Sequence, residues 1–118
     1  MTEDAAKVVA TYFDAWKAND FATLRSVLAE GVDFVGPLGR ADNADVYREG
    51  IERLSQIKTG IVVRKTFVDG PDVLTWFDLH TKVAPPTPVA NWSHVEDGKI
   101  TRVRVTFDAR PLAPQNRH

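Results

Sequence analysis

The fold of this chain is constrained most tightly by residues 89–108, two β-prone stretches joined by the turn sequence Glu96-Asp97-Gly98. Both stretches are rich in Val, Thr and aromatic residues, and Asp-Gly between such stretches is a strong signal for a tight turn. We therefore predict a long β-hairpin. Successive side chains of a strand point to opposite faces, so a slip of one residue in the pairing exchanges the two faces. The register of the hairpin thus decides which side chains meet the core.

The turn allows two registers. A two-residue turn pairs Glu96 with Lys99, whereas a three-residue loop with Gly98 as a bulge pairs Val95 with Lys99. We favour the second register, because it separates an apolar face from an amphipathic one. Its inner face carries Val89, Asn91, Ser93, Val103, Val105 and Phe107, and its outer face Trp92, His94, Ile100, Arg102 and Arg104. In the first register Trp92 and His94 would join the inner face.

The composition is that of one ordinary globular domain. The chain has 118 residues, of which 43% are hydrophobic and 26% charged, enough for a single core. A net charge of −1 without a basic block argues against nucleic acid and membrane surfaces as partners. The lack of cysteine excludes disulfides and thiol catalysis, and no segment reads as a signal peptide or a membrane span. We expect a cytoplasmic protein with one domain at residues 1–110 and a tail at residues 111–118.

Three helices are predicted before the hairpin. The first covers residues 2–17, with Thr2 as its N-cap and an apolar stripe at helical spacing: Ala5, Val8, Val9, Tyr12, Phe13 and Trp16. Asp20 begins a second helix that ends at Gly31, and Asp42 or Asn43 begins a third that ends near Gly60.

The pattern then changes from helical to alternating. Strands are predicted over residues 32–35, 61–68 and 73–83, and residues 84–88 form a proline-rich connection to the hairpin. This order indicates an α+β domain in which three N-terminal helices pack on a curved, mostly antiparallel sheet.

Three short sequences carry a family resemblance: Tyr-Phe-Asp-Ala-Trp at 12–16, Phe-Val-Gly-Pro at 34–37 and Trp-Ser-His-Val-Glu-Asp-Gly-Lys-Ile at 92–100. With the order of elements, they resemble the nuclear transport factor 2-like superfamily, and within it the SnoaL-like group. The resemblance implies a cone-shaped fold with an apolar pocket between the first helix and the sheet, and dimers formed through the sheet face. Its members include isomerases, polyketide cyclases, epoxide hydrolases, dehydratases and binding modules without activity.

The similarity to ketosteroid isomerase and limonene epoxide hydrolase is distant. The first places Tyr12 and Asn91 at the two oxyanion-hole positions, which implies two donors to a developing oxyanion. The general-base position of that enzyme, however, falls on Gly36. Of the three catalytic positions of limonene epoxide hydrolase, only Asp78 matches, since Trp76 and Val105 replace the arginine and the second aspartate. Neither mechanism is intact.

Alternation along residues 73–83 places Trp76, Asp78 and His80 on one face. The family comparison points this face inward, where Asp78 and His80 would share a proton near neutral pH. The predicted catalytic group is therefore Asp78 as base or acid, His80 as its partner, and Tyr12 and Asn91 as oxyanion donors. The predicted pocket wall consists of Trp16, Phe34, Trp76, Val89, Val103, Val105 and Phe107.

Three hypotheses follow. The leading one is an isomerase or cyclase that needs no cofactor and acts on a small, apolar, oxygen-bearing molecule. The rival is a ligand-binding or protein-interaction module without turnover, and in the third, large side chains fill the cone as plain core. No metal is expected, because Asp78 and His80 supply too few ligands.

Overall fold

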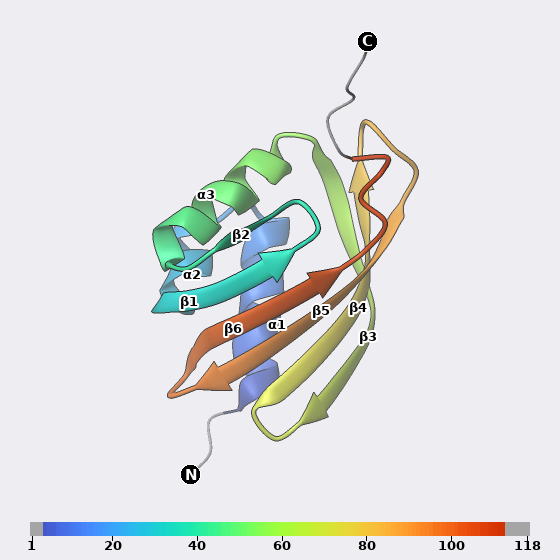
Figure 1. The fold of residues 1–118 in the computed structure, drawn as a ribbon. Coiled ribbons are helices and arrows are strands. Elements are labelled where there is room, and N and C mark those ends of the chain that lie inside the picture. The colour runs from blue at the N-terminus through green and yellow to red at the C-terminus, as the bar shows by residue number, and fades with distance from the viewer. Residues whose placement is uncertain (1–3, 113–118) are drawn as a thin grey trace.

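A computed structural model describes residues 4–112, and its helices cover one face of a curved six-stranded sheet (Figure 1). The helices are α1 (Ala5–Lys17), α2 (Phe21–Ser26) and α3 (Ala44–Ser55). The strands are β1 (Leu28–Gly36), β2 (Gly39–Ala41), β3 (Lys58–Asp69), β4 (Asp72–Thr81), β5 (Thr87–Glu96) and β6 (Lys99–Thr106). Their order is β2-β1-β6-β5-β4-β3, with β1 and β6 parallel and all other neighbours antiparallel. The predicted α+β class is confirmed.

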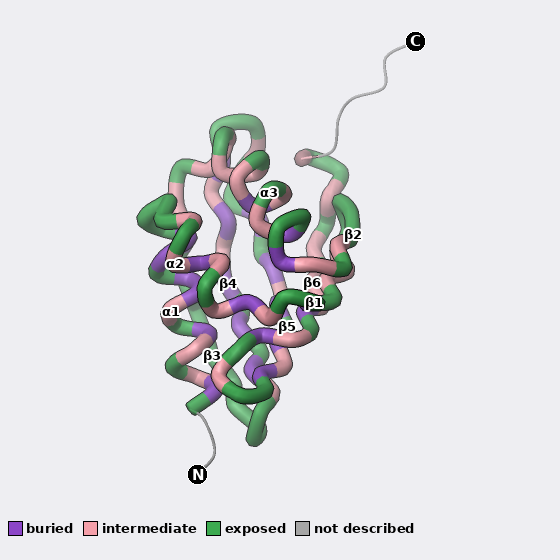
Figure 2. Tube along the Cα trace, turned by 90° about the vertical axis from the view of Figure 1, so that its left-hand side faces the viewer, coloured by how far each residue is buried: buried purple, intermediate pink, exposed green. Residues whose placement is uncertain are grey.

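Helix α1 lies along the concave face of the sheet. Its N-cap is Asp4, whose side chain accepts a hydrogen bond from the Lys7 amide at 3.3 Å; the expected cap, Thr2, lies outside the described residues. The buried side of the helix carries the predicted apolar stripe, including Val9, Tyr12, Phe13 and Trp16 (Figure 2). None of the helices in the described chain is long and apolar enough to cross a membrane.

The second helix is shorter than predicted, because it ends at Ser26 and the chain then enters the sheet. Leu28 begins β1 and pairs in parallel with Ile100, and the Val27 carbonyl accepts a hydrogen bond from the Ile100 amide at 2.8 Å. This long-range pairing overrides the local helical pattern. Strand β1 is accordingly longer than the predicted residues 32–35, and β2, which the sequence did not indicate, folds back on it.

Helix α3 begins at the predicted place and ends early. The Asn43 side chain accepts a hydrogen bond from the Val46 amide at 2.9 Å, which identifies Asn43 rather than Asp42 as the N-cap. The helix ends at Ser55 instead of near Gly60, since residues from Lys58 onward already pair with β4 as strand β3.

The turn of the β5–β6 hairpin follows the register that we did not favour. Glu96 pairs with Lys99, so the loop contains only two residues. Both of them, Asp97 and Gly98, have positive φ, 53° and 75°, as a type I′ turn requires. The prediction of a three-residue loop with a bulge at Gly98 is therefore wrong.

A bulge farther along the hairpin restores the predicted faces. The pair Val95 and Ile100 is followed by the pair His94 and Arg102, which leaves Thr101 as the extra residue. Beyond it, the inner face carries the expected set, including Asn91, Ser93, Val103 and Val105. Ile100, predicted to face outward, is fully buried instead, because it lies between the turn and the bulge.

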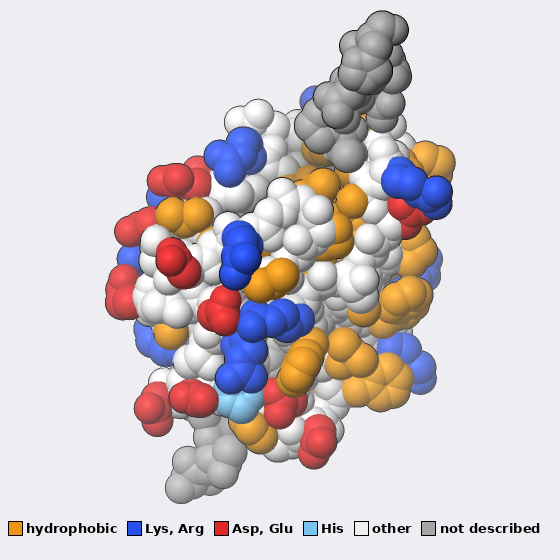
Figure 3. Space-filling model, viewed as in Figure 1, with side chains coloured by type: hydrophobic (Ala, Val, Ile, Leu, Met, Phe, Trp, Pro, Cys, Tyr) orange, Lys and Arg blue, Asp and Glu red, His pale blue; other side chains and the backbone are white. Residues whose placement is uncertain are grey.

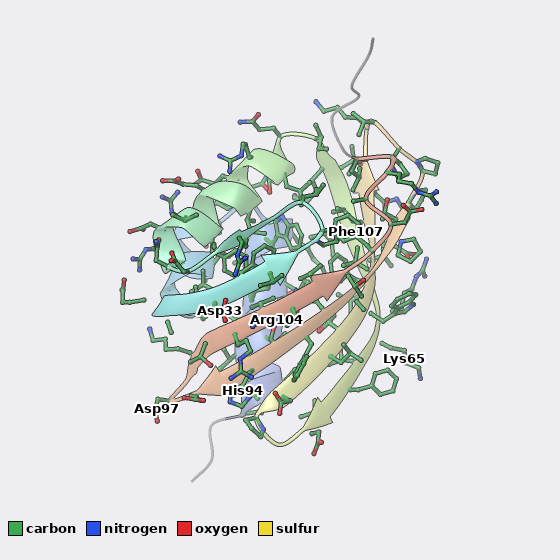
Figure 4. The ribbon with its side chains drawn as sticks, in the orientation of Figure 1. Asp33, Lys65, His94, Asp97, Arg104 and Phe107 are labelled. Atoms are coloured by element: carbon green, nitrogen blue, oxygen red, sulfur yellow. The ribbon has the colours of Figure 1, made fainter. Side chains whose placement is uncertain are left out.

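The convex face of the sheet has a charged half and an apolar half (Figure 3). Charged side chains gather over β1 and β6, where Arg104 donates to the Asp33 carboxylate at 3.0 Å (Figure 4). Over the opposite half, large apolar side chains are exposed: Val62, Phe67, Leu74, Trp76 and Trp92. We call this set the apolar patch.

Candidate functional site

A cavity of about 500 Å³ lies between the concave face of the sheet and helices α1 and α3. Its walls are mainly apolar side chains contributed by all of these elements, among them Trp16, Ile51, Leu54, Phe77, Leu79, Val89 and Val105. The turn between β1 and β2 belongs to the lining, and its Leu38 is 48% exposed. The cavity therefore opens to solvent beside this turn.

Two tyrosine hydroxyls meet in the cavity wall. The hydroxyl oxygens of Tyr12 on α1 and Tyr47 on α3 are 2.8 Å apart and form a hydrogen bond in which either can donate. Both residues are buried, and this burial raises the pKa of each phenol well above its ordinary value. The pair therefore stays protonated. The mutual bond uses one of the two protons, and no described residue accepts the other.

Local packing fixes the position of this pair. The Phe34 ring stacks on the Tyr47 ring, with centroids 4.6 Å apart and planes inclined by 21°. A side chain at Gly36 would interfere, because a Cβ atom there would lie 2.9 Å from Cζ of Phe34. The absence of a side chain at Gly36 thus allows the stack that supports Tyr47. On the other side, the Trp16 indole donates to the Ser55 hydroxyl at 3.0 Å and joins α1 to α3.

Asn91 on β5 adds a polar group to the inner face. The side chain is buried and lines the cavity, and its oxygen accepts a hydrogen bond from the Ser93 hydroxyl at 2.8 Å. No described residue accepts a hydrogen bond from the Asn91 amide nitrogen, which leaves it available as a donor. Tyr12 and Asn91, both predicted site residues, therefore line one cavity.

The amino-acid sequence shows the family to which the chain belongs. The model of the SnoaL-like domain matches residues 9–103. The chain belongs to the SnoaL-like family. No curated protein matches it.

Solved structures similar to this SnoaL-like domain extend the comparison. A protein from Kribbella flavida is 35% identical, with a TM-score of 0.85 over 90% of this chain and 88% of its own. An NTF2-like protein of unknown function from Cytophaga hutchinsonii is 28% identical, with a TM-score of 0.82 over 95% and 96% of the two chains. An M. tuberculosis LEH-like epoxide hydrolase is 22% identical, with a TM-score of 0.77 over 92% and 85%, and this likeness shows the fold alone.

The inward orientation predicted for Trp76, Asp78 and His80 is wrong. In this SnoaL-like domain they lie on the outer face of β4, where Trp76 is 43% exposed. The opposite face of the strand packs on α1 through residues such as Phe77, because burial of apolar side chains is favourable and burial of a carboxylate is costly. Asp78 accepts a hydrogen bond from Nε of Arg64 at 2.8 Å, and Nη2 of Arg64 forms an ion pair with the same carboxylate oxygen at 2.7 Å. Neither Asp78 nor His80 lines the cavity.

Most of the predicted wall residues lie in the wall. Trp16, Phe34, Val89, Val105 and Phe107 line the cavity, and their contact with a ligand stays a prediction. Val103 does not line it, since its side chain is buried within the core of the sheet.

Sequence reasoning missed three polar residues of the lining: Tyr47, Arg40 and Arg53. Tyr47 had a usable signal, because it shares a helical stripe with Ile51 and Leu54, and a tyrosine in such a stripe brings a hydroxyl into the core. The arginines had none. Arg40 lies on β2, which was not predicted, and Arg53 reads as an ordinary exposed helix residue.

Proposed function

We propose that this protein binds a small, largely apolar molecule that carries a carbonyl oxygen, and that the Tyr12–Tyr47 pair donates a hydrogen bond to this oxygen. The observation that carries the proposal is the buried hydroxyl pair with its raised pKa values inside an apolar cavity. One proton of the pair has no acceptor within the pair itself. A ligand oxygen would satisfy it, as buried polar groups require.

The size and chemistry of the cavity support this ligand class. A volume of about 500 Å³ suits a small organic molecule. Deep in the cavity, the polar groups offered to the ligand are donors, a phenol hydroxyl from the tyrosine pair and the amide nitrogen of Asn91. The tyrosine pair has one proton left to donate and the Asn91 nitrogen can only donate, so a ligand oxygen with two lone pairs is the polar atom that both groups can bind.

Binding without turnover is better supported than isomerase or cyclase activity. Proton abstraction needs a base within hydrogen-bond reach of the substrate. Among the described residues that line the cavity there is no carboxylate and no imidazole, and Asp78 and His80 lie on the other face of the sheet. The site thus has groups that polarise an oxygen, and it lacks a described group that takes a proton from carbon.

The proposal is tested with two ligands of nearly the same shape. The first is 2-acetylnaphthalene, and the second is 2-isopropenylnaphthalene, in which a CH₂ group replaces the carbonyl oxygen. In the Tyr12→Phe/Tyr47→Phe double variant, the Kd of the ketone should rise about three- to tenfold, the value of one neutral hydrogen bond. The Kd of the hydrocarbon should not rise. Titration calorimetry measures both values.

The double variant keeps both rings and removes both hydroxyls, so the fold is retained. Asp78→Asn is the control: it changes the group that we first predicted as the base, and it should leave the Kd of the ketone unchanged. Equal changes for the ketone and the hydrocarbon would contradict the proposal. Consumption of the ketone by the wild-type protein, lost in Asp78→Asn, would restore the enzyme hypothesis.

A further inference from the structure

Helix α3 has a glycine at its middle, and this residue, Gly50, faces the cavity. Residues three and four positions apart are neighbours on the surface of a helix. The neighbours of Gly50 in this sense are Val46, Tyr47, Arg53 and Leu54. All four of them line the cavity, as does Gly50 itself. Gly50 therefore lies at the centre of the surface that α3 presents to the cavity.

The fold does not require a glycine at this position. Glycine is needed where φ is positive or where a side chain would meet neighbouring atoms. Gly36 is such a case, because a Cβ atom there would lie 2.9 Å from Cζ of Phe34. The backbone of Gly50 is helical, and a Cβ atom on it would have no described atom outside the adjoining backbone within 4 Å. Alanine would thus fit, and it would stabilise the helix, since glycine loses the most conformational freedom when a helix forms.

The missing side chain leaves space on the α3 side of the cavity. Val46 and Leu54, about one turn before and one turn after Gly50, carry apolar side chains, so apolar groups border this space. Tyr47, which bonds to Tyr12, is also a neighbour of Gly50 on the helix surface. A ligand whose oxygen accepts a hydrogen bond from the tyrosine pair therefore has its apolar body within reach of the Gly50 backbone.

We propose that Gly50 determines the size of the ligand: an apolar body wider than a single ring fills the space where a side chain would otherwise lie, and packs against the backbone of α3. This inference rests on the proposed function, because it assumes that the ligand oxygen binds at the tyrosine pair. It adds a residue that sets specificity. It also explains why α3 keeps a glycine that lowers its stability, because function and stability can favour different residues at a binding site.

The test compares acetophenone, which has one ring, with 2-acetylnaphthalene, which has two. The wild-type protein should bind the larger ketone about tenfold more tightly, because its second ring buries more apolar surface. In Gly50→Leu the new side chain takes the place of the second ring, so the Kd of 2-acetylnaphthalene should rise about tenfold. The Kd of acetophenone should not change. Titration calorimetry measures these values.

Glu49→Leu is the matched control. It adds the same side chain at the preceding position of α3, which is exposed and does not line the cavity, and it should leave the Kd of both ketones unchanged. Gly50→Ala separates the role of the space from the stability of the helix. Its Tm should be higher than that of the wild-type protein by about 2–5 °C, because alanine is the better helix former.

Four results would overturn the inference and leave the proposed function standing. The wild-type protein could bind both ketones equally, or Gly50→Leu could leave the Kd of 2-acetylnaphthalene unchanged. Gly50→Leu could also raise the Kd of both ketones by the same factor, or Gly50→Ala could lower the Tm, which would show that the fold itself needs the glycine. If neither ketone binds the wild-type protein, the proposed function itself fails.

Discussion

Two residues, Tyr12 and Tyr47, hold their phenol groups away from water, and the proposed ligand contact depends on them. A tyrosine hydroxyl without a partner is costly to bury, and the bond between Tyr12 and Tyr47 reduces that cost for both residues. The same burial disfavours the phenolate, which is why both pKa values are raised. The pair should therefore act as a neutral donor over the whole physiological pH range.

This state can be observed directly, because Tyr12 and Tyr47 are the two tyrosines of the chain. Absorbance at 295 nm should show no phenolate in the folded protein at pH 10, whereas the chain in guanidinium should titrate near pH 10. Above that pH the folded protein holds more protons than the unfolded chain, so the free energy of unfolding should fall as the pH rises. A phenolate signal with a midpoint near 10 in the folded protein would contradict the burial of the pair.

The sequence predicted single residues well where an apolar pattern decided their orientation. The helical stripe placed Tyr12 and Trp16 correctly, since burial of their neighbours leaves the helix no other orientation. Strand β4 shows the limit. Alternation correctly separated Asp78 and His80 from Phe77, but it does not say which set faces inward. The apolar set faces inward because its burial is favourable. The family comparison indicated instead that the set with Asp78 and His80 faces inward.

Among the elements, strands β4 and β5 are joined by a charged cluster on the convex face of the sheet. The protonated His94 ring donates at both nitrogens, to the Asp72 carboxylate at 2.8 Å and to the Glu96 carboxylate at 2.9 Å. The Trp92 indole also donates to Asp72, at 2.9 Å. The hydrogen bond with Asp72, followed by that with Glu96, raises the pKa of His94, and the bond with His94 lowers the pKa of Asp72.

The cluster should make stability depend on pH. Because the pKa of His94 is raised in the folded protein, the stabilisation that this residue provides is fully present below its pKa in the unfolded chain, about 6.5. It is lost as the pH rises through the pKa of the folded protein. Because the pKa of Asp72 is lowered in the folded protein, the stabilisation that this residue provides is present above about pH 4. It is lost as the pH falls further. His94→Gln should therefore lower the Tm by about 2–5 °C at pH 5.5. The loss should be smaller at pH 8.5.

Trp92→Phe provides the control, because it removes the other donor to Asp72 but no titrating group; the lost bond moves the pKa of Asp72 back toward its ordinary value, and Asp72 is ionised at both pH values. Its effect on the Tm should be the same at pH 5.5 and 8.5. Thermal unfolding followed by circular dichroism gives both numbers. A His94→Gln effect that does not vary with pH would show that the imidazole is not protonated by its two carboxylates.

Element boundaries were predictable where a cap or a turn residue marked them, as at Asn43 and Asp97-Gly98. They were not predictable where distant pairing decided, as in β1, whose partner β6 lies at the other end of the chain. The hairpin combined both cases. Its faces followed from apolar alternation, while the bulge at Thr101 leaves no local sequence signal.

The apolar patch on the convex face is a surface feature of the whole molecule that the cavity does not explain. Phe67 and Trp76 are 55% and 43% exposed within it. Adjoining exposed apolar residues on a sheet mark an interaction surface. We propose that it forms the contact of a homodimer, as the family resemblance implies.

Sedimentation velocity tests this proposal. The wild-type protein should sediment as a dimer at micromolar concentration, and Trp76→Glu should sediment as a monomer with a similar circular dichroism spectrum. Val83→Glu is the matched control, since Val83 is also exposed, at 55%, but lies outside the patch and the strands, and it should remain a dimer. A monomeric wild-type protein would rule the dimer out.

The proposed function requires that the tyrosine pair donates a hydrogen bond to a ligand carbonyl in the cavity. The most direct measurement is the infrared spectrum of 2-acetylnaphthalene, labelled with ¹³C at the carbonyl and bound to the protein. A hydrogen bond weakens the C=O bond, so its stretching frequency should be lower than in hexane, and it should return toward the hexane value in Tyr12→Phe/Tyr47→Phe. A frequency equal to that in hexane, or a lowered frequency that persists without the two hydroxyls, would contradict the claim.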